Sequence, residues 1–274
     1  MKGRVAVYRD AFVNYRWALF HVFVKKYPFS AILRENNKHI NISSPLEAYF
    51  YSRGLRDVVI DEGRDTVIFR FGNRQLRLVG AVKNGDLGAS FGEYRYLSVK
   101  DRTVVDIGAS IGDTAIYFAL IGEATKIIAL EPIQESYELA KKNTEINGCE
   151  DKIELINSGC GGVTKKIFID GDTKAISSTI LRETVSGTSV QLLTLKDITD
   201  KFCINDAVLK IDCEGCEYET VLMSDRETLR RFDQIQIEFH DGAGRLVKKL
   251  RSCGFQVYYS HGRAMGYIYA VRLD

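Results

Sequence analysis

Apolar residues recur along the 274-residue chain in two different patterns, which divide it into two parts. From Thr103 onward, apolar runs of strand length alternate with stretches of helical spacing, which is typical of βαβ units around a mostly parallel sheet. The expected strands lie at 103–107, 126–130, 152–157, 206–211, 234–239, 254–259 and 266–272. Because only a short glycine-containing connection joins the last two, the final strand is expected to run antiparallel. The pattern predicts an α/β fold with a seven-stranded sheet, one antiparallel strand and helices on both faces.

Residues before this sheet follow a helical spacing first. Apolar positions predict one long helix or two over 9–36, with a turn at Pro28. A further helix is expected at 45–51, where Ser44 precedes the apolar run as an N-cap.

The spacing then changes to alternation, which predicts a small antiparallel sheet with a hairpin turn at Gly72–Asn73. We therefore divide the chain into an N-terminal annex, residues 1–84, and an α/β domain, residues 85–274. The annex is a candidate for recognising the molecule on which the α/β domain acts. Within the domain, an insertion near 163–193 is expected to form a hairpin. The annex strands are expected at 58–60, 66–71 and 75–79, and the hairpin pairs 165–170 with 190–194.

The composition, with 45% hydrophobic residues, 27% charged residues and 3 prolines, is typical of a compact protein and excludes a disordered or repeat chain. Six cysteines lack the density of a disulfide scaffold, so reduced thiols and a cytoplasmic location are expected. Cys213 and Cys216 have redox or half-zinc spacing. No second pair or nearby histidine completes a zinc site, so a structural interpretation is favoured over metal binding.

The stretch Ala11–Val24 is too short and too polar to span a bilayer, and it lacks a signal-peptide cleavage site. Peripheral membrane contact stays open, since three aromatic residues share one helical face and two lysines follow them. These residues are Trp17, Phe20, Phe23, Lys25 and Lys26. Residues 1–100 carry 17 basic and 9 acidic residues, against 21 and 27 in 101–274. A basic front end suits an anionic partner such as a phosphosugar, a lipid head group or RNA, or it is a solvated face.

One loop carries the cofactor chemistry. Asp106 lies at the carboxyl end of the first parallel strand, and the loop after it opens a helix at Asp113 or Thr114. This is the crevice where open α/β sheets bind ligands. Gly108 and Gly112 let the backbone approach a ligand without a Cβ in the way.

The same loop argues against a dinucleotide. A dinucleotide fingerprint needs glycine at 108, 110 and 113, and here the last two are Ser110 and Asp113. Carboxylates at Asp106 and Asp113 would also repel a pyrophosphate, whereas they suit the sulfonium and ammonium of S-adenosylmethionine. The pattern therefore favours S-adenosylmethionine over NAD.

Two further strand ends complete the predicted cofactor site. Glu131 and Pro132 follow the second strand, where a carboxylate can accept both ribose hydroxyls. Asn157 and Ser158 follow the third strand, where polar groups can meet the adenine edge.

These motifs resemble the FkbM family of class I S-adenosylmethionine-dependent methyltransferases. Val105–Asp113 is similar to the family's cofactor loop, Ile128–Pro132 to its ribose strand, and Leu209–Glu219 to its fourth-strand signature. Phe91–Tyr94 is similar to an element that precedes the cofactor loop. The resemblance covers about residues 85–260 and implies a Rossmann-like sheet and methylation of hydroxyl groups, often on sugars or natural products. The chain departs from the family pattern at Ser110, Cys213 and Lys196, where Asn, Val and Asp respectively are usual.

The complete set of residues expected at the cofactor is Asp106, Gly108, Ser110, Gly112, Asp113, Thr114, Glu131, Pro132, Asn157, Ser158, Tyr94 and Asp212.

A hydroxyl acceptor needs a base. His240 ends the fifth strand and titrates near neutral pH, so it is the first candidate for the general base. Asp212 is expected to orient the acceptor or the donor end. Glu214 is a second catalytic candidate or caps the following helix, which starts near Gly215. With Glu238, these carboxylates also offer a site for Mg²⁺, a lesser alternative to a metal-free site.

Three functions remain open. The leading hypothesis is an O-methyltransferase for a small molecule or glycan. An RNA methyltransferase that uses the basic annex is the alternative, although no Asn-Pro-Pro-Tyr motif and no aromatic-basic strip is present. A third is a catalytically inactive scaffold that binds S-adenosylmethionine, against which the intact Asp106, Glu131 and Asp212 weigh.

Overall fold

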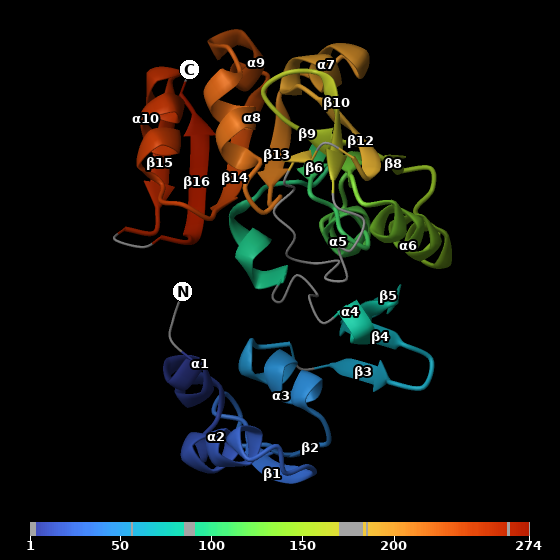
Figure 1. Cartoon of the computed structure of the whole chain (residues 1–274). Helices are drawn as coiled ribbons and strands as arrows, with labels where there is room; N and C mark the ends of the chain where they lie inside the picture. Colours follow the sequence, from blue (N-terminus) through green and yellow to red (C-terminus); the bar gives the residue numbers. More distant parts are fainter. Residues whose placement is uncertain are drawn as a thin grey trace. The chain divides into compact units, whose positions relative to one another are not determined.

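The computed structural model describes residues 4–55, 57–84, 91–169, 183–184, 186–261 and 264–273. The chain forms two compact units, Met1–Glu93 and Tyr94–Asp274, and each is described by itself (Figure 1). The boundary predicted from the sequence lies after Asn84. The glycines at 85 and 88 of the connecting loop lie outside the described residues.

The larger unit is built on a seven-stranded sheet with strand order β15-β16-β14-β13-β6-β7-β8. The strands are β6 (Thr103–Ile107), β7 (Lys126–Leu130), β8 (Ile153–Ile156), β13 (Ala207–Ile211), β14 (Phe232–Phe239), β15 (Phe255–Tyr259) and β16 (Gly266–Arg272). Only β16 runs antiparallel to its two neighbours in this sheet, β14 and β15. The predicted α/β class and the single reversed strand are confirmed.

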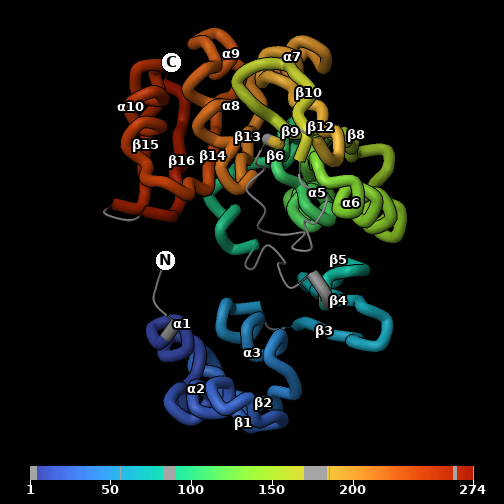
Figure 2. The backbone as a smooth tube through the Cα atoms, viewed as in Figure 1, coloured from blue at the N-terminus to red at the C-terminus, as the bar shows by residue number. Residues whose placement is uncertain are grey.

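Helices alternate with these strands along the chain (Figure 2). They are α5 (Asp113–Leu120), α6 (Gln134–Ile146), α7 (Leu195–Lys201), α8 (Glu217–Met223), α9 (Arg226–Arg230) and α10 (Gly244–Ser252), and a 3₁₀ helix, η1, spans Phe91–Tyr96. Helices α5 and α6 pack against β6, β7 and β8, and α8, α9 and α10 pack against β14 and β15. Strand β13 is buried along its whole length, as an inner strand covered on both faces requires.

The insertion adds a second, four-stranded sheet with order β11-β10-β12-β9. Its strands are β9 (Gly159–Cys160), β10 (Lys165–Ile169), β11 (Glu183–Thr184) and β12 (Thr188–Leu193). The expected hairpin is present, because β10 pairs antiparallel with β12. Residue 170, which the sequence analysis included in the first strand, lies outside the described residues.

The smaller unit combines short helices with two antiparallel sheets. Its elements are α1 (Arg4–Ala11), α2 (Tyr15–Phe23), β1 (Phe29–Ile32), β2 (His39–Ile42), α3 (Pro45–Ser52), β3 (Val58–Asp61), β4 (Thr66–Phe71), β5 (Arg74–Val79) and α4 (Ala81–Asn84). Helix α3 begins as predicted, with the Ser44 hydroxyl accepting the Glu47 amide at 3.1 Å. Strands β3, β4 and β5 form the predicted three-stranded sheet.

The helical prediction for the last part of 9–36 is wrong, because β1 pairs antiparallel with β2. Pro28 lacks an amide hydrogen and cannot continue a helix. After it, Phe29 and Ala31 are buried while Ser30 is exposed, which is the period of a strand. Asn37 adopts a φ of 56° in the turn that reverses the chain. No described helix of either unit is both long and apolar enough to cross a membrane.

Candidate functional site

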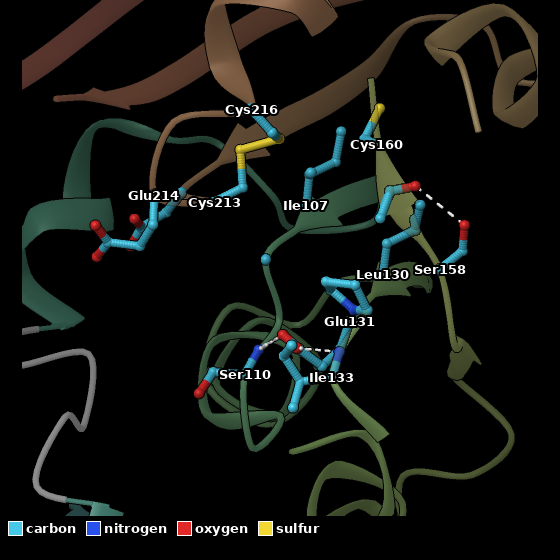
Figure 3. A pocket seen from close by; sticks show the side chains of 14 residues that line it. Ile107, Ser110, Leu130, Glu131, Ile133, Ser158, Cys160, Cys213, Glu214 and Cys216 are labelled. Atoms are coloured by element: carbon cyan, nitrogen blue, oxygen red, sulfur yellow. Dashed lines mark hydrogen bonds between the residues drawn. A yellow bond between two sulfur atoms is a disulfide. The ribbon is translucent and has the colours of Figure 1, made fainter. Parts of the chain in front are cut away.

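A pocket lies at the carboxyl ends of β6, β7 and β13 (Figure 3). It is lined by Ile107, Gly108, Ser110, Leu130, Glu131, Pro132, Ile133, Ser158, Gly159, Cys160, Asp212, Cys213, Glu214 and Cys216. Six of the predicted cofactor residues are among these: Gly108, Ser110, Glu131, Pro132, Ser158 and Asp212. The other six do not line it: Asp106, Gly112, Asp113, Thr114, Asn157 and Tyr94.

The loop after β6 requires glycine at position 108 for two reasons. Gly108 has a φ of +81°, where L side chains are strained, and an added Cβ would lie 1.8 Å from the Asp212 carbonyl oxygen. The cofactor loop therefore packs directly on the end of β13. Gly112 also has a left-handed φ, +85°, and an added Cβ there would lie 3.2 Å from the Ala140 Cα atom. The sharp turn expected at both glycines is present, and both pack closely on other segments of the chain; their approach to a ligand stays a prediction.

Glu131 is a buried carboxylate that faces the pocket. Its Oε2 accepts the Ser110 amide at 2.8 Å and its Oε1 accepts the Ile133 amide at 2.9 Å (Figure 3). Burial raises the pKa of Glu131 from 4.5 to about 7, although the two amides act in the opposite direction. No lysine or arginine of the described chain forms an ion pair with it. Each oxygen of the carboxylate therefore accepts one amide and keeps a further lone pair that can accept a hydrogen bond.

Asp106 lies behind the pocket lining. It is fully buried, with Oδ1 2.8 Å from Lys210 Nζ and Oδ2 accepting the Thr114 hydroxyl at 2.5 Å. Lys210 Nζ also donates to the Gly108 carbonyl at 2.8 Å. Burial alone would lower the pKa of Lys210, but Asp106 and Asp212 raise it above its ordinary value. The ion pair braces the cofactor loop, and direct contact of Asp106 with the cofactor stays a prediction.

Lys210 was not predicted as a site residue, although the sequence holds a signal for it. A lysine within the apolar run of β13 must meet a buried negative charge, because an unpaired charge in a core is too costly. The register of the sheet places Lys210 beside Asp106.

The remaining predicted cofactor residues surround the loop. Asp113 and Thr114 form the buried first turn of α5. The Tyr94 ring packs against Phe118 with centroids 5.3 Å apart, and burial followed by the charge of Asp212 raises the pKa of Tyr94 well above its usual value. The Asn157 amide donates to the Glu131 carbonyl at 3.0 Å, so it supports the chain just after β7 without lining the pocket.

His240 is held between two carboxylates at the end of β14. Its Nδ1 lies 3.1 Å from Glu217 Oε1, and its Nε2 lies 3.3 Å from Glu214 Oε2. The backbone amide of His240 donates to the same Glu217 oxygen at 3.1 Å. The hydrogen bond with Glu217 raises the pKa of His240 from 6.5 to about 9; burial opposes the shift and Glu214 adds to it. The pKa of His240 therefore lies above the near-neutral value that was expected from the sequence.

Glu217 is the second residue that the sequence analysis missed. It is fully buried, and its Oε2 accepts the Gly215 amide at 2.8 Å. The amide before α8 is thus accepted by Glu217, which corrects the expectation that Glu214 caps this helix. The sequence signal for this role is that Glu217 lies in the first turn of α8, shortly after Gly215, where a carboxylate can accept free backbone amides.

Residues 106–257 match the model of the methyltransferase FkbM domain, which is more than half of the chain. The chain belongs to the FkbM methyltransferase family. The predicted resemblance is confirmed, and with it S-adenosylmethionine as the methyl donor of this domain. No curated protein matches the chain.

Solved structures with a similar fold include methyltransferase FkbM from Methylobacillus flagellatus KT, which is 16% identical with a TM-score of 0.44. That match covers 62% of this chain and 43% of the other, so this chain spans less than half of that protein's length. Another is TrmK from M. capricolum in complex with S-adenosyl-homocysteine, which is 14% identical with a TM-score of 0.45. It covers 67% of this chain and 68% of that one.

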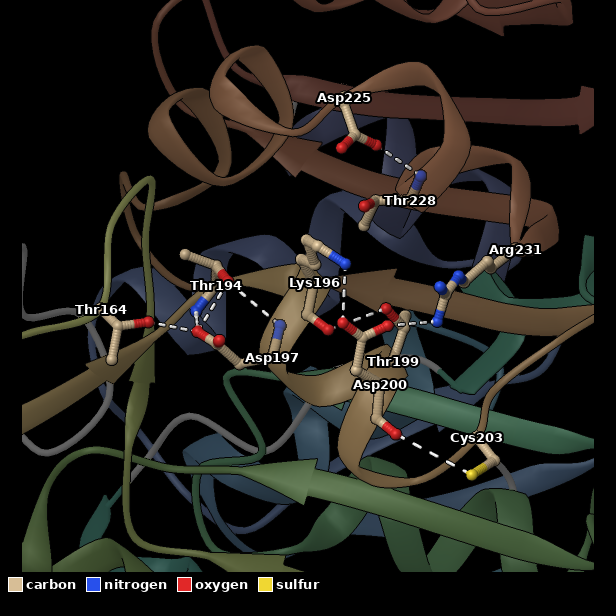
Figure 4. Close-up of polar contacts among 10 residues, drawn as sticks. All are labelled: Thr164, Thr194, Lys196, Asp197, Thr199, Asp200, Cys203, Asp225, Thr228 and Arg231. Carbon is tan, nitrogen blue, oxygen red and sulfur yellow. Dashed lines mark hydrogen bonds and ion pairs between the residues drawn. The ribbon is translucent and has the colours of Figure 1, made fainter.

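Lys196 stands where Asp is usual in the FkbM family, and it does not line the pocket. Lys196 pairs with Asp200 at 2.7 Å, one turn along α7, and Arg231 meets the same carboxylate at 2.7 Å (Figure 4). Asp197 closes a capping box with Thr194, which starts the helix. The lysine is therefore a surface residue of α7.

Cys213 and Cys216 form a disulfide that lines the pocket of the FkbM domain (Figure 3). The expectation of reduced thiols is wrong for this pair. The turn between them holds Glu214 and Gly215 at positive φ and brings the two Cα atoms to 5.5 Å, within the usual range for a disulfide. The thiols at 149, 160, 203 and 253 are free.

Asp212 and Glu214, which line the pocket, and His240, which does not, offer donor atoms that all lie within 4.8 Å of one another. Glu238, which the sequence analysis added to this group, is not part of it. These are the described residues that would hold a metal ion.

Proposed function

We propose that the protein transfers a methyl group from S-adenosylmethionine to a hydroxyl group of a small molecule or glycan. One observation carries the proposal: the buried Glu217 holds the His240 imidazole by Nδ1, beside two carboxylates that share a pocket with Glu131. A histidine oriented by a buried carboxylate is a suitable base for a hydroxyl.

The residues of the pocket fit the donor. Glu131 already accepts two amides, and a carboxylate has about four lone-pair sites, so it retains acceptor capacity for the ribose hydroxyls. The charged residues of the lining are Glu131, Asp212 and Glu214, with no lysine or arginine among the described ones. Negative charge at this position favours a ligand that carries a sulfonium and an ammonium.

When bound, S-adenosylmethionine supplies a methyl group on a sulfonium, whose sulfur leaves as a neutral thioether. His240 takes the proton of the acceptor hydroxyl at Nε2 as the oxygen attacks the methyl carbon. Glu217 keeps the proton on Nδ1, which fixes the tautomer and stabilises the imidazolium that forms. Glu214 lies beside Nε2 and orients the acceptor.

The lining also bears on the acceptor. A phosphate-rich acceptor needs cations close to the reacting atoms, and the described lining is acidic. This supports a neutral hydroxyl over a nucleic acid.

Transfer of labelled methyl from S-adenosylmethionine to a panel of monosaccharides, oligosaccharides and tRNA tests the proposal. We expect label on a sugar or other small hydroxyl compound. Label on tRNA alone would support the RNA alternative, and tight S-adenosylhomocysteine binding without transfer to any acceptor would support a scaffold.

The base is tested by His240→Gln, which should lower kcat by roughly 10²–10⁴-fold while the affinity for S-adenosylhomocysteine stays unchanged. His39→Gln, an exposed histidine of β2, is the matched control. Because the pKa of His240 is raised to about 9, kcat/KM should rise with pH up to that value. Glu217→Gln should move the inflection toward the ordinary value of 6.5, and an unchanged pH profile would remove Glu217 from this role.

A further inference from the structure

Helix α2 of the smaller unit is apolar on two faces. One face packs against the unit's core, where Ala18 and His21 are buried and Leu19 and Val22 are partly buried. A nine-residue surface helix needs one such face only. The second apolar face therefore has no role in the described core.

The second face carries five exposed apolar side chains, which we call the aromatic stripe. They are Val13 (43% exposed), Trp17 (53%), Phe20 (55%), Phe23 (86%) and Val24 (44%). Residues 17, 20 and 24 are spaced at three and four residues, so they form one row along the helix and its C-cap, and Val13 lies in the turn before the helix. Single exposed apolar residues are ordinary, but a contiguous row of this size marks an interaction surface.

The aromatic stripe is held in its outward position by His21. The Trp17 ring packs on the His21 ring in a tilted contact with centroids 4.1 Å apart, and Phe20 meets the same ring edge-on at 5.5 Å. His21 in turn is fixed by its Nδ1, 3.0 Å from the Trp17 carbonyl, and by the buried Phe29 beneath it. The stripe is thus built on a fixed base.

Positive charge surrounds the aromatic stripe. Lys25 and Lys26 follow it directly and Arg16 lies within it, all three exposed. Residues 4–28 contain five basic residues and a single acidic one, Asp10. Aromatic residues flanked by lysine and arginine are the pattern of helices that lie in the interface of an anionic bilayer.

We propose that the aromatic stripe docks the protein on the surface of an anionic lipid membrane. Insertion of Trp17, Phe20 and Phe23 removes apolar surface from water, while Lys25 and Lys26 meet the lipid head groups. A second copy of the chain is a poor occupant, since its stripe carries the same positive charge. The proposal does not depend on the methyl acceptor.

The chain contains one tryptophan, Trp17, so its fluorescence reports on the stripe directly. Full-length protein is mixed with vesicles of phosphatidylcholine, with or without phosphatidylserine. We expect a blue shift of the emission and co-sedimentation with the anionic vesicles, both reduced at high salt.

Two variants separate the apolar and the charged contributions. Phe20→Ser/Phe23→Ser should weaken vesicle binding by roughly tenfold or more, because the buried apolar area is lost. Lys25→Glu/Lys26→Glu should also weaken binding to anionic vesicles by roughly tenfold or more. Met223→Ser/Tyr258→Ser changes two exposed apolar residues of the larger unit and should leave binding unchanged. All six side chains are exposed, so none of the substitutions should lower stability. Thermal melting checks that each variant is folded.

No emission shift with anionic vesicles would overturn the proposal, as would equal binding to neutral ones. A dimer in solution that Phe20→Ser/Phe23→Ser dissolves would replace the membrane with a second copy.

Discussion

Two neighbouring strands of the main sheet end in buried carboxylates with opposite surroundings. Asp106, near the end of β6, is ion-paired with Lys210 and accepts the Thr114 hydroxyl. Glu131, directly after β7, accepts two amides and forms no ion pair with a described cation, and its pKa is raised to about 7. The first carboxylate is held by a cation of the protein, although its Oδ1 accepts no hydrogen bond. Each oxygen of the second accepts one amide and keeps lone pairs for a ligand that donates hydrogen bonds. Burial alone therefore does not distinguish the two carboxylates; the cation paired with Asp106 does.

The largest effect on this comparison is expected from Lys210→Met. It leaves Asp106 buried and ionised without its cation, which should lower the free energy of unfolding by roughly 3–5 kcal/mol. Urea unfolding measures the change.

The matched control is the double variant Asp106→Asn/Lys210→Met. Removing both charges should restore most of the lost stability, because no uncompensated charge remains. A Lys210→Met protein as stable as the wild type would show that the ion pair does not brace the loop.

The next effect concerns the other strand. We expect Glu131→Gln to weaken S-adenosylhomocysteine binding by about 100-fold, because two hydrogen bonds to a charged acceptor are lost. Isothermal titration calorimetry measures the affinity, and thermal melting controls for folding. An unchanged affinity would place the ribose elsewhere.

A smaller effect follows from the raised pKa of Glu131. Since its pKa of about 7 lies above the ordinary 4.5, the stability that this group contributes to the ligand-free protein is present below pH 4.5 and is lost as pH rises through 7. Ribose hydroxyls favour the ionised form, so the affinity for S-adenosylhomocysteine should fall by about tenfold from pH 8 to pH 6. Glu131→Gln should remove this dependence, and a wild-type affinity independent of pH would contradict the assignment.

The sequence predicted the sheet well because buried parallel strands leave continuous apolar runs. Strands β6, β7 and β16 have the predicted bounds. The hairpin of β1 and β2 was not predicted. The apolar spacing changes from helical before Pro28 to alternating after it, and no other break in the sequence marks the change.

The partners of the site residues were harder to predict than the residues themselves. Lys210 meets Asp106 through the register of two strands that are distant in sequence. Glu217 meets His240 only after a turn with two residues at positive φ. Neither contact can be predicted from local sequence spacing. The sequence therefore indicated the carboxylates but not which of them is paired with a cation of the protein.

The central claim is that the pocket binds S-adenosylmethionine and that Glu131 accepts the ribose hydroxyls. One calorimetric experiment tests this claim most directly. Wild type and Glu131→Gln are each titrated with S-adenosylhomocysteine and with its 2′,3′-dideoxy analogue at pH 8. We predict that removing the hydroxyls costs the wild type about 100-fold in affinity and costs the variant little, because each change removes the same hydrogen bonds. Equal losses in both proteins would contradict the assignment.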